Sequence, residues 1–443
     1  MTAPDVVIII TDEERAAPTY EPAELRAWRE TRLKGRRWFT DHGVDFARHY
    51  VAATACVPSR PSLLTGQYPD LHGVTQTDGL AKQADDSRMR WLRPGEVPTI
   101  GHWFRAAGYD THYDGKWHVS HADIMVDGVP LPTNTADGAV IADNVERYRR
   151  ADPLDPYGFT GWIGPEPHGG RLRDCGYVRD PLIAARVVAW LADRYARRRA
   201  GDADALRPFL LVVGFVNPHD IVLWPLWARR GLPFEARPDD PPPIPPSPTD
   251  HEDLADKPAA QLAFRGAYPS AYGPPVMVRR AYRRDDEYRW LYHRLHLEVD
   301  TPIDQVRLAV TSGGSGDAVL ALTSDHGDLL GAHGGLHQKW FNLYDEAVRV
   351  PLQIVRIGEH PTSPATVTDA VTSHVDLLPT LLGLAGIDAP SARRELEADH
   401  SEVHPLPGRD LSELVHRPSA VLEGGAYVMS RDNILEGDGI ANA

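Results

Sequence analysis

Near its start the chain carries the sequence Val6-Val7-Ile8-Ile9-Ile10-Thr11-Asp12-Glu13. An unbroken run of five β-branched aliphatic residues is typical of a strand that is buried on both faces, as in a parallel sheet. Two adjacent acids directly after such a strand cannot both point into a packed core. One or both of Asp12 and Glu13 are therefore expected to face a cation, and a helix N-cap pair is the alternative.

Short apolar runs of the same kind recur at residues 209–215, 318–322 and 352–355. Each run is bounded by Gly, Pro, Asp or Ser, and segments with helical spacing of apolar residues lie between the runs. The pattern predicts an α/β fold in which helices flank a central, doubly wound, mostly parallel sheet. The clearest helix candidates are residues 23–41, 180–198 and 288–297.

A second pair of possible metal ligands, Asp325-His326, follows the predicted strand at residues 318–322. The carboxyl ends of parallel strands meet at one edge of a sheet, where ligands of such folds bind. Carboxylate oxygens are ligands of hard divalent cations. The two pairs together therefore predict a cation site at this edge.

Length and charge limit the class of protein. A chain of 443 residues exceeds the usual size of a single core, so we expect a large α/β domain over residues 1–390 and a small C-terminal subdomain over residues 391–443. The net charge of −15 argues against a nucleic-acid partner, because phosphate binding requires a basic face. No apolar stretch approaches the ~18 residues of a membrane span, so no membrane partner is expected.

The chain has two cysteines, Cys56 and Cys175, and therefore no disulfide framework. Cys175 is interpreted as a free structural thiol. The first residues lack the basic and long apolar regions of a signal peptide. These features predict a cytoplasmic protein.

Cys56 opens the run Cys56-Val57-Pro58-Ser59-Arg60-Pro61-Ser62-Leu63-Leu64-Thr65-Gly66. Pro61 suits the first turns of a helix, and Gly66 is expected to end that helix after about two turns. Residue 56 would then lie at a helix start, where unpaired backbone N–H groups attract negative charge. A cysteine at such a position is otherwise most often a small buried apolar residue.

The order Cys-x-Pro-Ser-Arg, with the later Thr-Gly, resembles the signature of the type I sulfatases, a family of the alkaline phosphatase superfamily. The resemblance implies an alkaline-phosphatase-like fold and hydrolysis of a sulfate monoester to an alcohol or phenol plus sulfate. It also implies that a formylglycine-generating enzyme oxidises Cys56 to formylglycine. In that family one hydroxyl of the hydrated aldehyde attacks sulfur and the other later expels sulfate, a step that a thiol cannot perform.

The resemblance also implies one divalent metal, held by Asp12, Glu13, Asp325, His326 and residue 56. Calcium is usual in the family. Many members carry Asp where Glu13 stands and Asn where His326 stands, and an imidazole suits manganese better than an amide does. The resemblance therefore implies Ca²⁺, with Mn²⁺ as the alternative.

Further motifs complete the resemblance. Gly115-Lys116-Trp117-His118 supplies Lys116 to the anion and His118 as the base for the nucleophile. His219, in Asn217-Pro218-His219-Asp220, is implied as the general acid for the leaving alcohol, and Lys339 as a second sulfate-binding lysine. Arg60 lies one helical turn after residue 56 and is expected to hold the anion with two parallel hydrogen bonds.

Two alternatives stay open. A phosphonate monoester or phosphodiester hydrolase of the same superfamily shares the Asp-His pair, although those relatives tend to lack the lysine and histidine found here at 116 and 118. The second alternative is a non-catalytic binding protein on a sulfatase scaffold, although every expected catalytic position carries a suitable residue. The sequence carries no signal for an oligomeric state or for one particular sulfate ester.

Other segments are interpreted as surface features. The segment at residues 75–79 and the loop around Trp91 are plausible specificity elements, and the proline-rich residues 238–248 a stiff surface excursion. The arginine cluster at residues 279–284 precedes three acids, so a solvated helix start is favoured over an anion patch.

Overall fold

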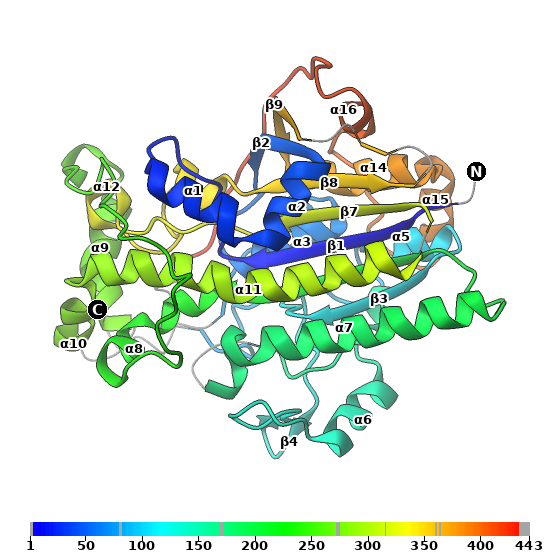
Figure 1. Ribbon diagram of the computed structural model, residues 1–443, viewed down its shortest axis with the longest axis horizontal. Helices are drawn as coiled ribbons and strands as arrows, with labels where there is room; N and C mark the ends of the chain where they lie inside the picture. The colour runs from blue at the N-terminus through cyan, green and yellow to red at the C-terminus, as the bar shows by residue number, and fades with distance from the viewer. Residues whose placement is uncertain are drawn as a thin grey trace.

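A seven-stranded sheet forms the centre of the protein (Figure 1). The structure is a computed structural model that describes residues 3–78, 82–167, 172–271, 275–314, 316–358, 361–362 and 365–433. Residue 79 of the predicted specificity segment, and residues 434–443 of the predicted subdomain, lie outside these ranges. In spatial order the strands are β3 (Asp110–Gly115), β6 (Phe209–Pro218), β1 (Asp5–Asp12), β7 (Ala318–Ser324), β8 (Leu352–Ile357), β2 (Val44–Tyr50) and β9 (Thr366–Ser373).

Strand β1 lies in the middle of the sheet and is buried over its whole length. It pairs in parallel with β6 on one side and with β7 on the other. Because successive side chains of a strand point to opposite faces, Ile8 and Ile10 belong to the core on one face, while Val7 and Ile9 belong to the core on the other. The prediction of a mostly parallel sheet covered on both faces is confirmed.

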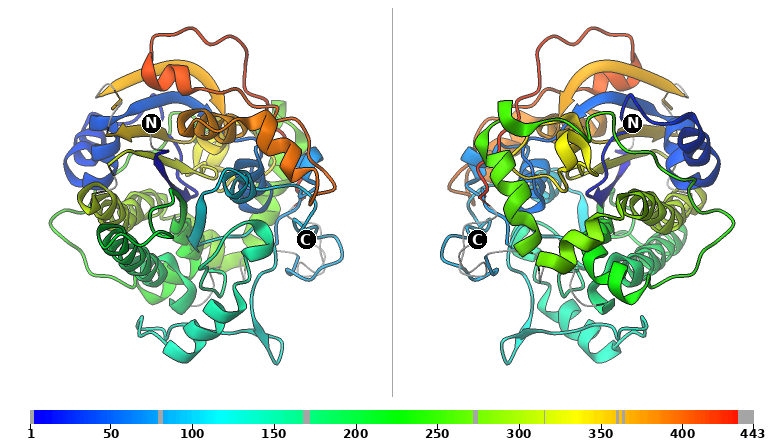
Figure 2. Two further views of the ribbon diagram at one scale, coloured as in Figure 1. Left: turned by 90° about the vertical axis from the view of Figure 1, so that its right-hand side faces the viewer. Right: turned by 90° about the vertical axis from the view of Figure 1, so that its left-hand side faces the viewer.

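Helices cover both faces of this sheet (Figure 2). Apolar side chains of α7, α11 and α2 pack on the face of Val7 and Ile9. Side chains of α3, α5 and α14 pack on the opposite face. The bounds of these helices are α2 (Lys34–His42), α3 (Cys56–Thr65), α5 (Ile100–Ala106), α7 (Gly176–Arg199), α11 (Asp285–Gly313) and α14 (His374–Ala385).

The remaining elements are short and lie around this core. They are α1 (Ala23–Arg32), α4 (Pro69–His72), β4 (Met125–Val126), β5 (Val129–Pro130), α6 (Ala142–Ala151), η1 (Asp155–Tyr157), η2 (Leu172–Asp174), η3 (His219–Leu223), α8 (Trp224–Arg230), η4 (Leu254–Asp256), α9 (Ala259–Ala271), α10 (Pro275–Tyr282), α12 (Ala332–Gly335), α13 (Asp345–Val348), α15 (Ala389–Leu396) and α16 (Ser412–His416). Within the described ranges, no helix has both the length and the apolar character needed to cross a membrane.

Two details differ from the sequence prediction. Residues 352–355 lie in β8, which pairs antiparallel with both β7 and β2 rather than in parallel. A strand buried on both faces has the same apolar run in either direction, so its composition does not reveal its orientation. The helix candidate at residues 23–41 is divided at Leu33, whose φ of −88° and ψ of 77° end α1 (Ala23–Arg32) before α2 begins.

The C-terminal part of the chain packs onto the main domain. Leu396 of α15, together with Leu414 and Val415 of α16, belongs to the same core as α3 and α14. Farther on, Met429 forms a parallel bridge with Ala53, and its N–H donates to the C=O of Ala52. Residues 429–433 therefore lie beside the segment that leads to Cys56. The division at residue 390 stays a prediction.

A buried ion pair holds this C-terminal segment in place. Lys82 Nζ lies 3.4 Å from a carboxylate oxygen of Asp432, and both side chains are almost completely buried. We expect Asp432→Ala to lower the free energy of unfolding by about 3–5 kcal/mol, because the Lys82 ammonium is then buried without its partner charge. The double variant Lys82→Met/Asp432→Ala should recover most of this loss in urea unfolding. A loss below about 1 kcal/mol in the single variant would contradict the prediction.

Candidate active site

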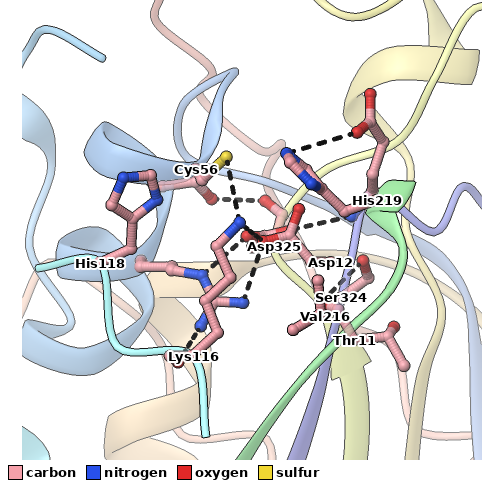
Figure 3. A network of polar contacts seen from close by, with 12 residues as sticks. Thr11, Asp12, Cys56, Lys116, His118, Val216, His219, Ser324 and Asp325 are labelled. Atoms are coloured by element: carbon pink, nitrogen blue, oxygen red, sulfur yellow. Dashed lines mark hydrogen bonds and ion pairs between the residues drawn. The ribbon is translucent and has the colours of Figure 1, made fainter. Parts of the chain in front are cut away.

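The predicted site residues come together at one edge of the sheet. Strands β3, β6, β1 and β7 are neighbours and run in parallel, so their carboxyl ends point the same way. Strand β2 has the same direction, because the antiparallel β8 lies between it and β7. The site residues at or just after these five strand ends are Lys116, His219, Asp12, Asp325 and, at the start of α3, Cys56. Figure 3 shows Cys56 between His118 on one side and Lys116 and Asp325 on the other.

Helix α3 begins at Cys56 and is buried throughout. It runs to Thr65, and Gly66 follows with a φ of +63°, the left-handed conformation that ends helices. The predicted helix over these residues is confirmed. All of its side chains are buried, so the surrounding packing holds the side chain of residue 56 in one position.

Unusual backbone conformations gather around this site. Ala55, directly before Cys56, has a φ of 69°, a region that residues other than glycine rarely adopt. Such conformations cost roughly 1–3 kcal/mol each and persist where the surrounding structure imposes them. Positive φ angles also occur at Glu13, His118 and Gln338. The fold therefore holds several site residues in fixed, unfavourable conformations.

Four buried side chains converge on one point. Asp12, Cys56, Asp325 and His326 each present one possible ligand atom, and these atoms lie within 4.8 Å of one another. His326 Nε2 lies 3.4 Å from Cys56 Sγ and 3.7 Å from an oxygen of each aspartate. His326 Nδ1 lies 3.0 Å from the C=O of Gly327. In the tautomer that donates there, the lone pair of Nε2 faces the cluster, as in a metal ligand.

The charges in this cluster fit a divalent cation. Burial and the Asp12 carboxylate raise the pKa of Asp325 to about 7. Burial also acts to raise the pKa of Asp12, but Lys116 and the other nearby cations outweigh it and hold that pKa well below its ordinary value. Asp12 Oδ1 has no hydrogen-bond donor among the described residues. Two buried carboxylates beside an imidazole lone pair are a suitable donor set for Ca²⁺ or Mn²⁺.

Arg60 joins the two aspartates. Its Nε donates to Asp325 Oδ2 at 2.9 Å, and one terminal nitrogen lies 3.2 Å from Asp12 Oδ2. The other terminal nitrogen donates to the C=O of Lys116 at 2.7 Å. In this structure Arg60 therefore orients both carboxylates and the end of β3, and the two parallel hydrogen bonds to a bound anion stay a prediction.

Glu13 belongs to a neighbouring group of possible ligands, formed with Asp12 and His219. Its Oε1 lies 3.1 Å from Lys339 Nζ, and its Oε2 lies 3.9 Å from His219 Nε2. Its backbone N–H donates to Asp325 Oδ1 at 3.1 Å. The sequence predicts one ligand set for all the acids, whereas the structure places the Glu13 carboxylate in an adjacent group that shares Asp12.

Lys116 lies against the same cluster and is completely buried. Its Nζ is 2.6 Å from Asp12 Oδ2 and 4.0 Å from Cys56 Sγ. Burial acts to lower the pKa of Lys116, but Asp12 and the other acidic groups outweigh it and raise that pKa above its ordinary value. The lysine is therefore a permanent positive charge beside residue 56.

Two acids that the sequence prediction did not assign to the site hold His118. Asp78 Oδ1 lies 2.8 Å from His118 Nε2, and the Glu166 carboxylate accepts the backbone N–H groups of Trp117 and His118. Asp78 lies in the segment that the sequence marks as a specificity element. Glu166 stands between two prolines, and no spacing relative to the Lys116 motif indicates its role.

The Cys56 thiol itself is a poor nucleophile here. Burial, with a further effect from the Asp12 carboxylate, raises the pKa of this thiol from 9 to about 12. The thiol therefore stays protonated at neutral pH, although the nucleophilic form of a cysteine is the thiolate. The other cysteine, Cys175, is also free and buried, as predicted for a structural thiol.

We expect unconverted Cys56 to resist alkylation in the folded protein. The raised pKa leaves far less thiolate at pH 8 than an ordinary cysteine has, and burial blocks access as well. Iodoacetamide labelling with EDTA present, followed by peptide mass measurement, should modify Cys56 only after urea is added. Rapid labelling of Cys56 in the native protein would contradict the buried position.

The sheet, with the strand-end cluster and the helix that starts at residue 56, has an α/β fold shared with solved sulfatase structures. A sulfatase family model matches residues 4–387, so the chain belongs to the sulfatase family. Sulfatases hydrolyse sulfate esters, and the protein is accordingly a sulfuric ester hydrolase.

Sequence relatives agree with this assignment, and a solved structure shares the fold. The chain is 26% identical to the uncharacterized sulfatase YidJ of Escherichia coli, covering 88% of this chain and 68% of that protein. It is 27% identical to a choline-sulfatase of Rhizobium meliloti, covering 79% of this chain and 62% of that protein. The fold is similar to that of a 2-O GAG sulfatase, with a TM-score of 0.63, 19% identity, and coverage of 94% of this chain and 74% of the other.

Proposed function

We propose that this enzyme hydrolyses a sulfate monoester to an alcohol or phenol plus sulfate, using formylglycine at position 56 and one divalent metal. The observation that carries the proposal is the position of Cys56 at the start of a buried helix. There it lies within 4.8 Å of three ligand groups and 4.0 Å from a buried lysine. A hydrated aldehyde at this position supplies two hydroxyl groups to the reaction.

Asp12, Asp325, His326 and the side chain at position 56 would hold the metal, with Glu13 beside them. A bound dication polarises an oxygen of the sulfate and favours ionisation of the attacking hydroxyl. Ca²⁺ is the expected ion because of the carboxylates, and the imidazole of His326 makes Mn²⁺ the alternative.

Buried lysines supply the remaining positive charge. Lys116 follows β3 and contacts Asp12, and Lys339 contacts Glu13. Both side chains are almost completely buried. Fixed charges in a site without bulk water stabilise developing negative charge far better than charges in water do. We assign these lysines to the non-bridging oxygens of the sulfate and to the leaving oxygen as its bond to sulfur breaks.

Two histidines are assigned to proton transfer. His118, whose Nε2 lies 2.8 Å from Asp78 Oδ1, is assigned as the base that takes a proton from position 56. His219 stands on the other side of the acid cluster, near Glu13, and we assign it as the acid that protonates the leaving alcohol. Arg60 acts by holding Asp12 and Asp325 in the geometry that the metal requires.

A small-molecule sulfate ester is the proposed substrate, and a formylglycine-generating enzyme is the proposed partner during maturation. The presence of two cysteines, both free, supports the proposed cytoplasmic location.

The test compares an aryl sulfate with an aryl phosphodiester and an aryl phosphonate, using one preparation co-produced with a formylglycine-generating enzyme. We expect kcat/KM to be at least about 10²-fold higher for the sulfate, a preference of roughly 3 kcal/mol in transition-state binding. A preference for the phosphonate or the phosphodiester would assign the site to that chemistry. A chain that is never converted, or is inactive on all three after conversion, would support a binding role.

A further inference from the structure

A cavity of about 220 Å³ lies outside the site described above. It is formed between α9, α10 and the segment that leads to Lys339, at the end of the molecule where α12 also lies (Figure 1). Its lining combines aromatic rings with arginines, and Asp285 is its one carboxylate among the described residues. The lining residues used below are Phe264, Tyr268, Tyr282, His337, Arg279 and Arg283.

The cavity has a rigid aromatic wall. The hydroxyl groups of Tyr268 and Tyr282 are hydrogen-bonded at 2.7 Å, and the ring of His337 lies 4.2 Å from that of Tyr282. His337 Nε2 in turn lies 3.4 Å from Asp285 Oδ1, so one carboxylate borders the cavity beside the imidazole. Flat aromatic surfaces with fixed polar groups at their edges are typical of small-molecule sites.

Arginines form the other wall. Arg279 and Arg283 are four residues apart on one face of a helical turn, and both line the cavity. Within the described part of the chain, neither guanidinium has an ion-pair partner. Arg284, by contrast, pairs with Glu287 and covers the ring of Trp224. All four arginines of this cluster are exposed, as the prediction of a solvated helix start expects, and Arg279 and Arg283 also border the cavity.

This cavity is close to the active site. His337 lines it, and Lys339 comes only two residues later, so their Cα atoms are at most about 7 Å apart. Phe264 and Tyr268 belong to the same apolar cluster as Trp340 and Ala55, the neighbours of Lys339 and Cys56. The Phe264 ring lies 6.1 Å from the Trp340 ring, and Lys339 Nζ lies 4.9 Å from that same ring, so a single residue separates the cavity wall from a site lysine.

We propose that the cavity binds a second negatively charged group of the substrate, carried by the sugar next to the sulfated one. The inference rests on the proposed function and narrows its substrate class to acidic carbohydrate sulfates. Guanidinium groups bind carboxylates and sulfates with paired hydrogen bonds, and aromatic rings offer a surface for the sugar. In a chain of net charge −15, such a local positive wall also counteracts the repulsion of an anionic substrate.

The experiment uses two disaccharide sulfates that share the sulfated sugar and differ only in its neighbour, glucuronic acid in one and glucose in the other. We expect the converted enzyme to have a kcat/KM about tenfold higher for the glucuronic acid compound, through KM. Arg279→Gln/Arg283→Gln should remove this preference while leaving the rate on an aryl sulfate within about twofold. Arg280→Gln is the matched control, because Arg280 is exposed on the same helix and does not line the cavity.

A third disaccharide, with a sulfate in place of the carboxylate, separates the two sources of charge. A preference for either acidic neighbour that the double variant loses supports the proposal. Equal KM values for the acidic and neutral compounds, or a preference for choline sulfate over all of them, would overturn it.

A failure of the proposed function is distinguishable from a failure of this inference. An enzyme that is inactive on the aryl sulfate and on every disaccharide would remove the proposed function. The cavity is then tested by calorimetry with the glucuronic acid disaccharide that lacks sulfate. Binding that weakens in the double variant and persists in Arg280→Gln supports the anion site, and heats that are the same in all three proteins refute it.

Discussion

Cys56→Ser is expected to fold normally and to lose steady-state turnover of an aryl sulfate by a factor of at least about 10³. Cys56 is buried and its side chain is small, so a serine fits the same space. A single hydroxyl can attack sulfur once, but it lacks the second hydroxyl that expels sulfate. The measurement is kcat on protein produced with the formylglycine-generating enzyme.

The matched control for this variant is Cys175→Ser, which replaces the other buried thiol. Cys175 precedes α7, donates to the C=O of Leu172 and is not among the possible metal ligands of the described residues. Its loss should leave kcat within about twofold. Intact mass gives a second readout, because formylglycine lies about 18 Da below cysteine. Substantial activity of Cys56→Ser would remove the assigned nucleophile.

Asp325→Asn is expected to abolish both metal binding and turnover. The change removes one of two buried carboxylates, and the Arg60 guanidinium loses a charged partner. We expect kcat to fall at least about 10³-fold. Independently of activity, Ca²⁺ or Mn²⁺ at 100 times Kd should stabilise the EDTA-treated wild-type protein by about 2.7 kcal/mol and leave Asp325→Asn unchanged.

Asp5→Asn is the control for that experiment. Asp5 is another buried, ion-paired carboxylate, at the opposite end of β1, where it pairs with Arg198. This variant should lose stability but keep the upward shift in Tm on addition of metal. A metal-dependent shift that survives in Asp325→Asn would place the cation elsewhere, and one that disappears in Asp5→Asn would show that the shift reports general stability.

Strands β1, β6 and β7 could be predicted because each is an apolar run that ends in a polar motif. Strands β2 and β9 were missed for the opposite reason. Strand β2 contains Asp45, Arg48 and His49, and β9 is partly exposed and rich in threonine, so neither shows a continuous apolar run. Strand β2 pairs with β9 and with β8, and these pairings come from tertiary contacts rather than from local sequence.

Within the site, residue types were easier to predict than contacts. Spacing places Arg60 on the same helix face as Cys56, but only the fold shows that its guanidinium is occupied by Asp12 and Asp325. In the same way, Asp78 and Glu166 lie far from His118 in the sequence and reach it only through loops. Such contacts have no periodic signature, which is why the sequence marked the histidine and missed the two acids that hold it.

The position of Arg60 has a consequence for how this site can change. One guanidinium contacts the ends of three strands, so a substitution at Asp12, at Asp325 or near Lys116 alters the surroundings of the other two. Double-mutant cycles among these positions should show epistasis of roughly 0.5–3 kcal/mol instead of additive losses. An attempt to redesign the site for another ion by exchanging single ligands would therefore fail unless residue 60 is altered in the same step.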